Sequence, residues 1–284
     1  MRNVNWLDVR AYDRLKTCYV LVKNLKRGGL GVKNPANFMI KMIAIDLDGT
    51  LLDLEGNLKD RVISEVDRIV KKGIAIIIAT GRDPISATQY AKKLRINYPI
   101  VACNGAVVWD PEYMKILFKK TIPLETAHTC LDKIAAFELT PFILEITKDC
   151  IFIVREATSN NQMQEIVKIY ASGLLEQIEF AKNEISAYFN GTIYMVTSYH
   201  KNLEICPSGI NKATGVAFVA NLLSISREEI ACIGDGENDV EMFEFANKRV
   251  AVDNAVEPVK RLADFIAPPN YRMGVVDALK WLAS

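Results

Sequence analysis

Two kinds of segment alternate along the chain from residue 42 onward. Short runs of β-branched residues, typical of buried strands, are followed by segments whose apolar residues recur every three or four positions, typical of amphipathic helices. Asp83 and Pro84 fit the cap and first position of one helix, and Gly73 fits the end of another. The predicted strand, helix, strand, helix and strand cover 42–47, 59–72, 74–79, 84–94 and 99–103. This order, with nearly all-apolar strands, predicts a parallel sheet covered by helices on both faces.

The middle of the chain, from 109 to 198, has a different pattern. Strands are expected at 142–147, 151–154, 186–189 and 193–198, and helices at about 123–138 and 161–171. Strands at 203–205, 230–233 and 249–252 and helices at 212–223, 238–246 and 274–282 then restore the first pattern. We therefore predict an α/β core domain made of 42–108 and 199–284, with an α+β domain inserted at 109–198.

Charge separates the first 41 residues from the rest of the chain. The 284 residues carry a formal net charge of +1, so the whole chain has no basic excess that would favour nucleic acid. Residues 1–41 contain nine basic and two acidic side chains, whereas the remainder has a net charge of −6. Their longest apolar run, 18–22, is too short for a signal peptide, and no Ser precedes Ser64, unlike in a mitochondrial leader. We interpret residues 1–41 as a basic extension that is disordered or not native.

Cysteine and histidine positions exclude several kinds of site. The six cysteines are scattered without a Cys-x-x-Cys pair, which is typical of reduced thiols in a cytoplasmic protein. The two histidines, His128 and His200, stand in polar surroundings away from other candidate ligands. We therefore expect neither a zinc site nor a Ser-His-Asp triad. No run approaches the roughly 18 apolar residues of a membrane span.

Asp46 and Asp48 come directly after the first predicted strand, in the string Asp46-Leu47-Asp48-Gly49-Thr50. Ligands bind at the carboxyl ends of strands in open α/β sheets. Alternate side chains of an extended chain point to the same side, so the two carboxylates can together hold a divalent cation. One can attack phosphorus to give an aspartyl-phosphate, while the other acts as general acid and then general base. A turn that only closes the strand is the alternative.

Two further segments contain groups that suit an anion. Thr80, Gly81 and Arg82 follow the second predicted strand and precede a helix, where a hydroxyl and free backbone N–H groups bind phosphate oxygens. A common Thr-Gly turn is the alternative, and Arg82 can instead brace the loop or face the insert. Lys212 begins a predicted helix, where the helix dipole favours anions, so a bound anion would explain it. The alternative is a solvated surface lysine.

A fourth segment, Gly234-Asp235-Gly236-Glu237-Asn238-Asp239, follows the strand predicted at 230–233 and begins a helix. Its glycines let the backbone come close to a metal-phosphate cluster. Asp235 suits an oxygen ligand of a cation, and Asn238 can donate a hydrogen bond to phosphate. Asp239 either orients its neighbours or caps the helix. All four segments thus lie at the carboxyl ends of predicted strands or at the start of a helix.

Together these segments resemble the haloacid dehalogenase superfamily of aspartate-nucleophile phosphatases, in its Cof-type branch. The resemblance covers about 42–284 and implies a Rossmann-like parallel-sheet core with an α/β cap inserted after the third core strand. It is carried by Asp46-x-Asp48-Gly-Thr, Ala79-Thr80-Gly81-Arg82, Cys103-Asn104-Gly105-Ala106, Glu204-Ile205-Cys206-Pro207 with Asn211-Lys212, and Gly234 to Asp239.

The resemblance also implies a role for each matching residue. Asp46 would be the nucleophile and a Mg²⁺ ligand, Asp48 the acid/base with its backbone carbonyl on the metal, and Asp235 a further metal ligand. The phosphoryl group would be held by the Leu47 backbone, Thr80, Gly81, Lys212 and Asn238, with Asp239, Asn104 and Arg82 in support.

From this resemblance we expect a Mg²⁺-dependent phosphatase, a phosphoric monoester hydrolase that acts through an aspartyl-phosphate. Its substrates would be small phosphorylated metabolites, such as sugar phosphates or phosphorylated cofactors. A phosphomutase of the phosphomannomutase type is the alternative, and a catalytically silent binding protein is disfavoured because every catalytic position is filled. We expect a cytoplasmic monomer or homodimer with no nucleic-acid or membrane partner.

Overall fold

The computed structural model describes residues 39–147, 152–160, 162–198 and 202–284. The predicted basic extension lies outside these ranges except for its last three residues, and so do Cys18, Cys150 and His200. Among the described residues, no helix has both the length and the apolar character needed to cross a lipid bilayer.

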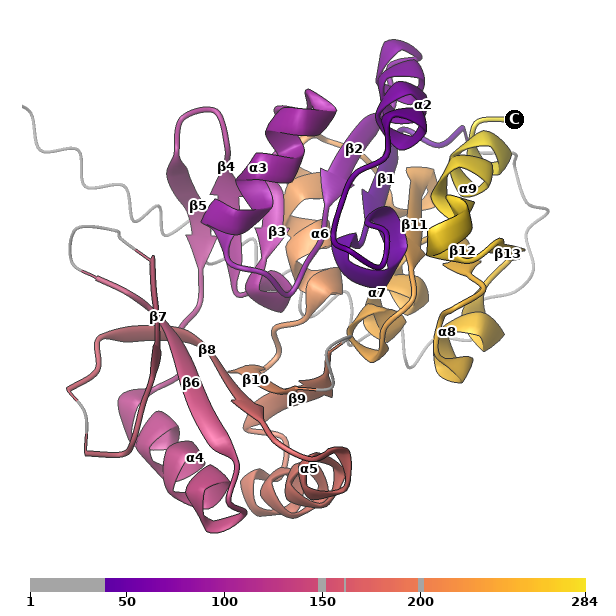
Figure 1. Ribbon diagram of the computed structural model, residues 1–284. Coiled ribbons are helices and arrows are strands. Elements are labelled where there is room, and N and C mark those ends of the chain that lie inside the picture. The colour runs from indigo at the N-terminus through magenta and orange to yellow at the C-terminus, as the bar shows by residue number, and fades with distance from the viewer. Residues whose placement is uncertain (1–38, 148–151, 161, 199–201) are drawn as a thin grey trace, which may run out of the picture. The chain divides into compact units, whose positions relative to one another are not determined.

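The core is a parallel sheet, as predicted (Figure 1). Its strands are β1 (Met42–Ile45), β2 (Ala75–Ile78), β11 (Ile230–Gly234), β12 (Lys248–Val252) and β13 (Phe265–Ala267). They pair in the order β13-β12-β11-β1-β2, and every neighbouring pair is parallel. Every residue of β1, β2 and β11 is buried, which explains why their sequences are continuous apolar runs.

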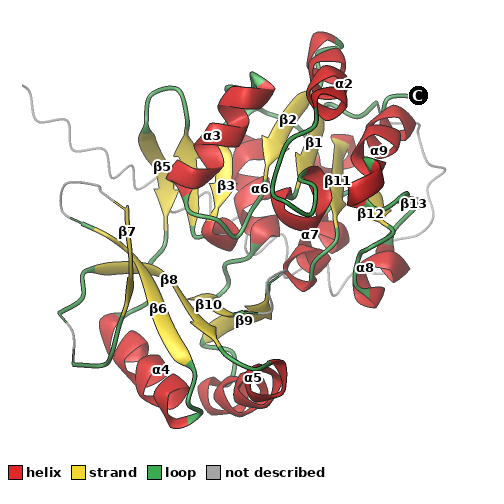
Figure 2. Ribbon diagram, viewed as in Figure 1, coloured by secondary structure: helices red, strands yellow, loops and turns green. Residues whose placement is uncertain are grey.

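Helices cover both faces of this sheet (Figure 2). One face holds α2 (Asp60–Lys71), α3 (Pro84–Leu94) and α9 (Gly274–Leu282), and the other holds α6 (Lys212–Leu222), α7 (Val240–Phe245) and α8 (Glu257–Leu262). Alternate residues of β1 divide accordingly: Ile43 and Ile45 pack with the first group, and Met42 and Ala44 with the second. The two apolar clusters hold the carboxyl ends of the strands in fixed positions.

The third predicted strand leaves the parallel sheet. β3 (Ile100–Ala102) forms an antiparallel sheet with β4 (Val107–Asp110) and β5 (Lys115–Lys119). A parallel bridge between Ala79 and Val101 joins it to the core. The β4–β5 hairpin was not predicted, and it packs into the core clusters although the insert is predicted to begin at 109.

A third sheet, which is antiparallel and has five strands, forms the inserted α+β domain. Its strands are β6 (Thr140–Ile146), β7 (Phe152–Glu156), β8 (Glu165–Ser172), β9 (Ile193–Thr197) and β10 (Leu203–Pro207), in the order β7-β6-β8-β10-β9. We call it the insert sheet. One face packs on α4 (Leu124–Ala136) and α5 (Leu175–Phe189). Leu144, Lys168, Tyr170 and Glu204 instead line a pocket shared with the core.

Two elements predicted in the insert are wrong. The helix predicted over 161–171 is replaced by β8, whose β-branched residues are buried between β6 and β10. β-branched side chains suit a central strand, and that preference outweighs a short helical spacing. The strand predicted over 186–189 is the end of α5, because the buried residues of that whole segment recur at helical spacing.

The strand predicted at 203–205 exists but joins the other sheet. It forms β10, which pairs antiparallel with β8 and β9 rather than with a core strand. A short apolar run predicts a strand but contains no information about its partners, since pairing is decided by the tertiary fold. From β10 the chain passes through only 208–211 before α6 begins.

Candidate active site

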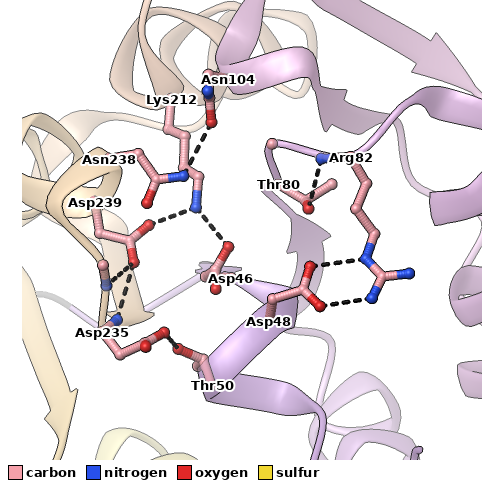
Figure 3. Close-up of polar contacts among 12 residues, drawn as sticks. Asp46, Asp48, Thr50, Thr80, Arg82, Asn104, Lys212, Asp235, Asn238 and Asp239 are labelled. Carbon is pink, nitrogen blue, oxygen red and sulfur yellow. Dashed lines mark hydrogen bonds and ion pairs between the residues drawn. The ribbon is translucent and has the colours of Figure 1, made fainter. Parts of the chain in front are cut away.

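The turn that follows β1 carries Asp46 and Asp48 in different directions (Figure 3). Asp46 is 5% exposed, and its backbone N–H donates to the carbonyl of Ile233 in the neighbouring strand. Asp48 instead accepts two hydrogen bonds from the guanidinium of Arg82, at 2.6 and 2.7 Å. The two carboxylates therefore have different partners, which is the requirement for giving them different chemical roles.

Lys212, the first residue of α6, is completely buried. Its Nζ donates to Asp46 Oδ1 at 2.5 Å and to Asp239 Oδ1 at 2.7 Å. Burial lowers the pKa of Lys212, but the charges of Asp239 and Asp46 more than offset this and raise it above its ordinary value. The side chain is thus a fixed cation beside Asp46, and the alternative of a solvated surface lysine is wrong.

Asp235 and Asp239 lie in the loop after β11, opposite Asp46 (Figure 3). Asp235 Oδ1 accepts a hydrogen bond from Thr50 Oγ1 at 2.6 Å. Asp239 Oδ2 accepts from the backbone N–H of Asp235 at 2.9 Å. Asp239 therefore orients two groups, the loop through this hydrogen bond and Lys212 through its other oxygen. A Cβ on Gly234 would lie 2.5 Å from Asp239 Oδ2, so only glycine permits this arrangement.

The three carboxylates are arranged to hold a cation. One oxygen each from Asp46, Asp235 and Asp239 lies within 4.8 Å of the others. Burial, followed by the charge of Asp239, raises the pKa of Asp235 to about 7. Burial also raises the pKa of Asp46 well above its ordinary value, although Lys212 opposes this. Lys212 alone does not balance three acids, and carboxylate oxygens are the donors that a small divalent cation prefers, so the residues fit such an ion.

Arg82 braces the loop that precedes α3. Its guanidinium bonds to Asp48 and donates to Tyr90 Oη at 3.1 Å, and its backbone N–H donates to Thr80 Oγ1 at 3.1 Å. Thr80 is 1% exposed, and Gly81 lines the same pocket as Asp46 and Asp48. Arg82 therefore braces the loop in the core and does not extend towards the insert.

The insert sheet supplies to the pocket Lys168 and Tyr170, which the sequence did not single out, and Glu204, which belongs to one of the motifs that carry the resemblance. The pocket has a volume of about 400 Å³ between the core residues already described and the insert sheet. Lys168 and Glu204 pair there at 3.0 Å, and both are buried. The Tyr170 ring stacks on Phe142, with 5.0 Å between ring centroids. A lysine within the apolar run of β8 was the sequence feature that could have indicated a buried functional group. The incorrect prediction of a helix over 161–171 placed this lysine on a helix instead of a central strand.

Asn104 and Asn238 complete the set of predicted residues. Asn238 Nδ2 donates to Asn104 Oδ1 at 3.0 Å, and both side chains are buried (Figure 3). Leu47 differs, because its side chain is buried in the core cluster and only its backbone belongs to the turn after β1. The structure thus gathers residues from five separate segments, while their catalytic roles stay predictions.

Comparisons with known proteins identify the family of this chain. A family model described as haloacid dehalogenase-like hydrolase matches residues 43–165 and 154–279. The 5-amino-6-(5-phospho-D-ribitylamino)uracil phosphatase YitU of Bacillus subtilis is 27% identical over 84% of this chain and 96% of its own length. The phosphoglycolate phosphatase of Archaeoglobus fulgidus is 32% identical over 86% of this chain and 98% of its own. The crystal structure of a haloacid dehalogenase-like hydrolase from Bacteroides thetaiotaomicron matches with a TM-score of 0.72 and 27% identity, over 86% of this chain and 99% of that one.

Proposed function

Since the chain belongs to the haloacid dehalogenase-like hydrolases and is a phosphoric monoester hydrolase, we propose that it hydrolyses small phosphorylated metabolites with Mg²⁺ through an aspartyl-phosphate on Asp46. The observation that supports this most directly is the fully buried Lys212, paired with Asp46 and Asp239 beside a third carboxylate. That cluster combines a nucleophile, a fixed positive charge and a set of cation ligands in one place.

In the first step, one oxygen of Asp46 attacks phosphorus in line with the leaving oxygen. Asp48 gives a proton to that oxygen, and the alcohol departs. Lys212, Thr80, the backbone N–H of Gly81 and Asn238 neutralise the charge spread over the equatorial oxygens. In the second step Asp48 takes a proton from water, which attacks phosphorus, and orthophosphate and the free Asp46 carboxylate result.

Mg²⁺ held by Asp46, the backbone carbonyl of Asp48 and Asp235 would neutralise phosphoryl charge. Arg82 has a separate duty in this scheme. Its two hydrogen bonds hold the carboxylate of Asp48 in one orientation. To give a proton to the leaving oxygen, Asp48 has to turn away from Arg82, so substrate binding is expected to loosen this pair before the first step.

The size of the pocket supports a small ester. A volume of about 400 Å³ is near the lower end of ligand sites, and it is bounded by polar groups of the core and by Leu144 and Tyr170 of the insert. Cys103, Cys130, Cys206 and Cys232 are buried free thiols, which supports a cytoplasmic protein.

The test is orthophosphate release by the purified full chain from a panel of phosphate esters that includes phosphoglycolate and 5-amino-6-(5-phospho-D-ribitylamino)uracil. We expect release that requires Mg²⁺, stops with EDTA and returns when Mg²⁺ is restored. Isomerisation of hexose phosphates without release would instead favour the phosphomutase. Turnover that survives chelation would contradict the metal assignment, and no release from any ester would contradict the proposal.

A further inference from the structure

A chain of four buried polar side chains connects the insert sheet to the loop after β11. Lys168 Nζ of β8 donates to Glu204 Oε1 of β10 at 3.0 Å, and Asn104 Nδ2 donates to Glu204 Oε2 at 2.5 Å. Asn104 Oδ1 accepts from Asn238 Nδ2 at 3.0 Å. None of the four residues is more than 8% exposed. We call this set, Lys168, Glu204, Asn104 and Asn238, the amide relay.

The direction of every hydrogen bond in the amide relay follows from Glu204. A carboxylate only accepts, so the amide nitrogen of Asn104 must face it. The carbonyl oxygen of Asn104 then faces Asn238, so Asn238 must donate a hydrogen bond from its own amide nitrogen. Lys168, which only donates, compensates the charge of Glu204 from the other side.

This orientation matters at the pocket, because Asn238 lines it. The amide nitrogen of Asn238 carries two hydrogens, one of which bonds to Asn104. A phosphoryl group offers only acceptors, so it binds the nitrogen end of an amide and is repelled by the oxygen end. Glu204 therefore decides, through Asn104, whether the core presents a donor or an acceptor to phosphate.

The amide relay also contacts the loop that contains Gly81. A Cβ on Gly81 would lie 3.1 Å from both Asn104 Oδ1 and Glu204 Oε2, closer than most side-chain contacts allow. Lys168 Nζ also donates to the backbone carbonyl of Gly81 at 2.7 Å. Glycine at 81 thus lets the insert reach the core at this point.

We propose that Glu204 is a positioning residue: by accepting from Asn104 it fixes the amide of Asn238 as a donor to the phosphoryl group, so that phosphate affinity depends on β10 being seated against the core. This inference rests on the proposed function, since it assumes that phosphate binds at Asn238. It goes beyond that function because it assigns part of the phosphate site to a residue of the insert that does not touch phosphate.

The experiment measures the dissociation constant of orthophosphate by calorimetry, with Mg²⁺ present, for Glu204→Gln, Asn238→Ala and the double variant. Glutamine keeps the shape of Glu204 but lets the neighbouring amides turn over. We expect Glu204→Gln to weaken orthophosphate binding about tenfold, as for the loss of a hydrogen bond to a charged group. In the Asn238→Ala background the same change should alter binding less than about twofold. Equal losses in both backgrounds would overturn the relay.

Tyr194→Phe is the matched control. It removes a hydrogen bond of 2.7 Å from an insert strand to Glu241 of α7, which lies outside the relay. We expect orthophosphate binding to stay unchanged; a loss equal to that of Glu204→Gln would mean that general seating of the insert is responsible, and the relay would be refuted.

Folding and function are separated by two further measurements. If Glu204→Gln does not fold, the double variant Lys168→Met with Glu204→Gln takes its place, because it removes both charges together. We expect the same loss of orthophosphate affinity, and an equal loss in the Asn238→Ala background would again overturn the relay. If the wild-type protein releases orthophosphate from esters but the variants bind orthophosphate as tightly as the wild type does, the relay alone is overturned. Wild-type protein that neither hydrolyses esters nor binds orthophosphate would overturn the proposed function and the relay together.

Discussion

Two buried lysines contact carboxylates that line the pocket, one in the core and one in the insert, and their surroundings differ. Lys212, in the core, contacts Asp46 and Asp239, and Asp235 lies in the same cluster. Lys168, in the insert, contacts a single carboxylate, Glu204, and a backbone carbonyl. The core cluster therefore has more negative than positive charge, whereas the insert pair is balanced.

This difference separates a reacting site from an orienting one. Buried carboxylates in excess of cations are costly, and the raised pKa of Asp46 and Asp235 reflects that cost. A bound divalent cation relieves it, so the core cluster is prepared for a metal ion. A balanced pair such as Lys168–Glu204 needs no ligand, and its effect is to fix the direction of neighbouring hydrogen bonds.

The largest effect should come from removing the nucleophile. Asp46→Asn keeps the shape of the side chain and leaves Lys212 paired with Asp239, so the fold should survive. We expect ester hydrolysis to fall by at least about 10⁴-fold, because a carboxamide does not attack phosphorus. Orthophosphate release under saturating Mg²⁺ measures the rate, and thermal unfolding measures the fold. A folded variant that keeps a tenth of its activity would place the nucleophile elsewhere.

Replacing each lysine in turn compares the two sides directly. Lys212→Met should lower the hydrolysis rate by about 10²–10³-fold, since a fixed charge on the transferring phosphoryl group is lost. Lys168→Met should cost about tenfold, because Lys168 contacts Glu204 and the Gly81 carbonyl rather than the carboxylate that attacks phosphorus. Steady-state kinetics on one ester, with Tm as a check on folding, gives both values. Equal losses would mean that the distinction between reacting and orienting sides is wrong.

The pH dependence of stability should distinguish the core cluster from the Lys168–Glu204 pair, although the effect is smaller than those of the substitutions above. In metal-free protein the pKa of Asp235 rises from 3.8 to about 7 on folding, so the folded state binds more protons in that interval. Stability is then greatest below the unfolded pKa and falls as pH increases towards 7. We expect Tm with EDTA to drop by at least about 2 °C more in wild type than in Asp235→Asn between about pH 5 and pH 8.

Lys168→Met is the companion variant for this measurement. Burial lowers the pKa of Lys168, but Glu204 more than compensates, so it lies above the ordinary 10.5 and outside that pH interval. The variant should therefore keep the wild-type pH slope even if its Tm is lower. A slope that disappears with Lys168→Met, or is undiminished in Asp235→Asn, would contradict the assignment of this proton uptake to Asp235.

The core could be predicted from the sequence much more fully than the insert. Helices on both faces of a parallel sheet require all-apolar strands, and Asp83 caps α3 by accepting from the N–H groups of Ile85 and Ser86, so local pattern and tertiary structure agree there. Asp46 and Asp235 were predictable because strand ends in such a sheet converge.

The insert side was not predictable in the same way. In an antiparallel sheet with one face towards the pocket, the sequence of β8 fits a helix as well as a strand over a short window. Contact between Lys168 and Glu204 depends on β8 pairing with β10, and contact between Glu204 and Asn104 depends on a fold that joins positions 100 residues apart. Neither pairing has a local signal.

The membership of β10 in the insert sheet has a consequence for protein engineering. A chimaera that exchanges inserted domains by cutting at residue 199 would leave β10 with the recipient, although β10 is hydrogen-bonded to β8 and β9. The recipient's β10 would then have to pair with two strands from the other parent, and Glu204 would come from a different parent than Lys168. Crossover points after Pro207, before Lys212 begins α6, keep each strand with its own partners.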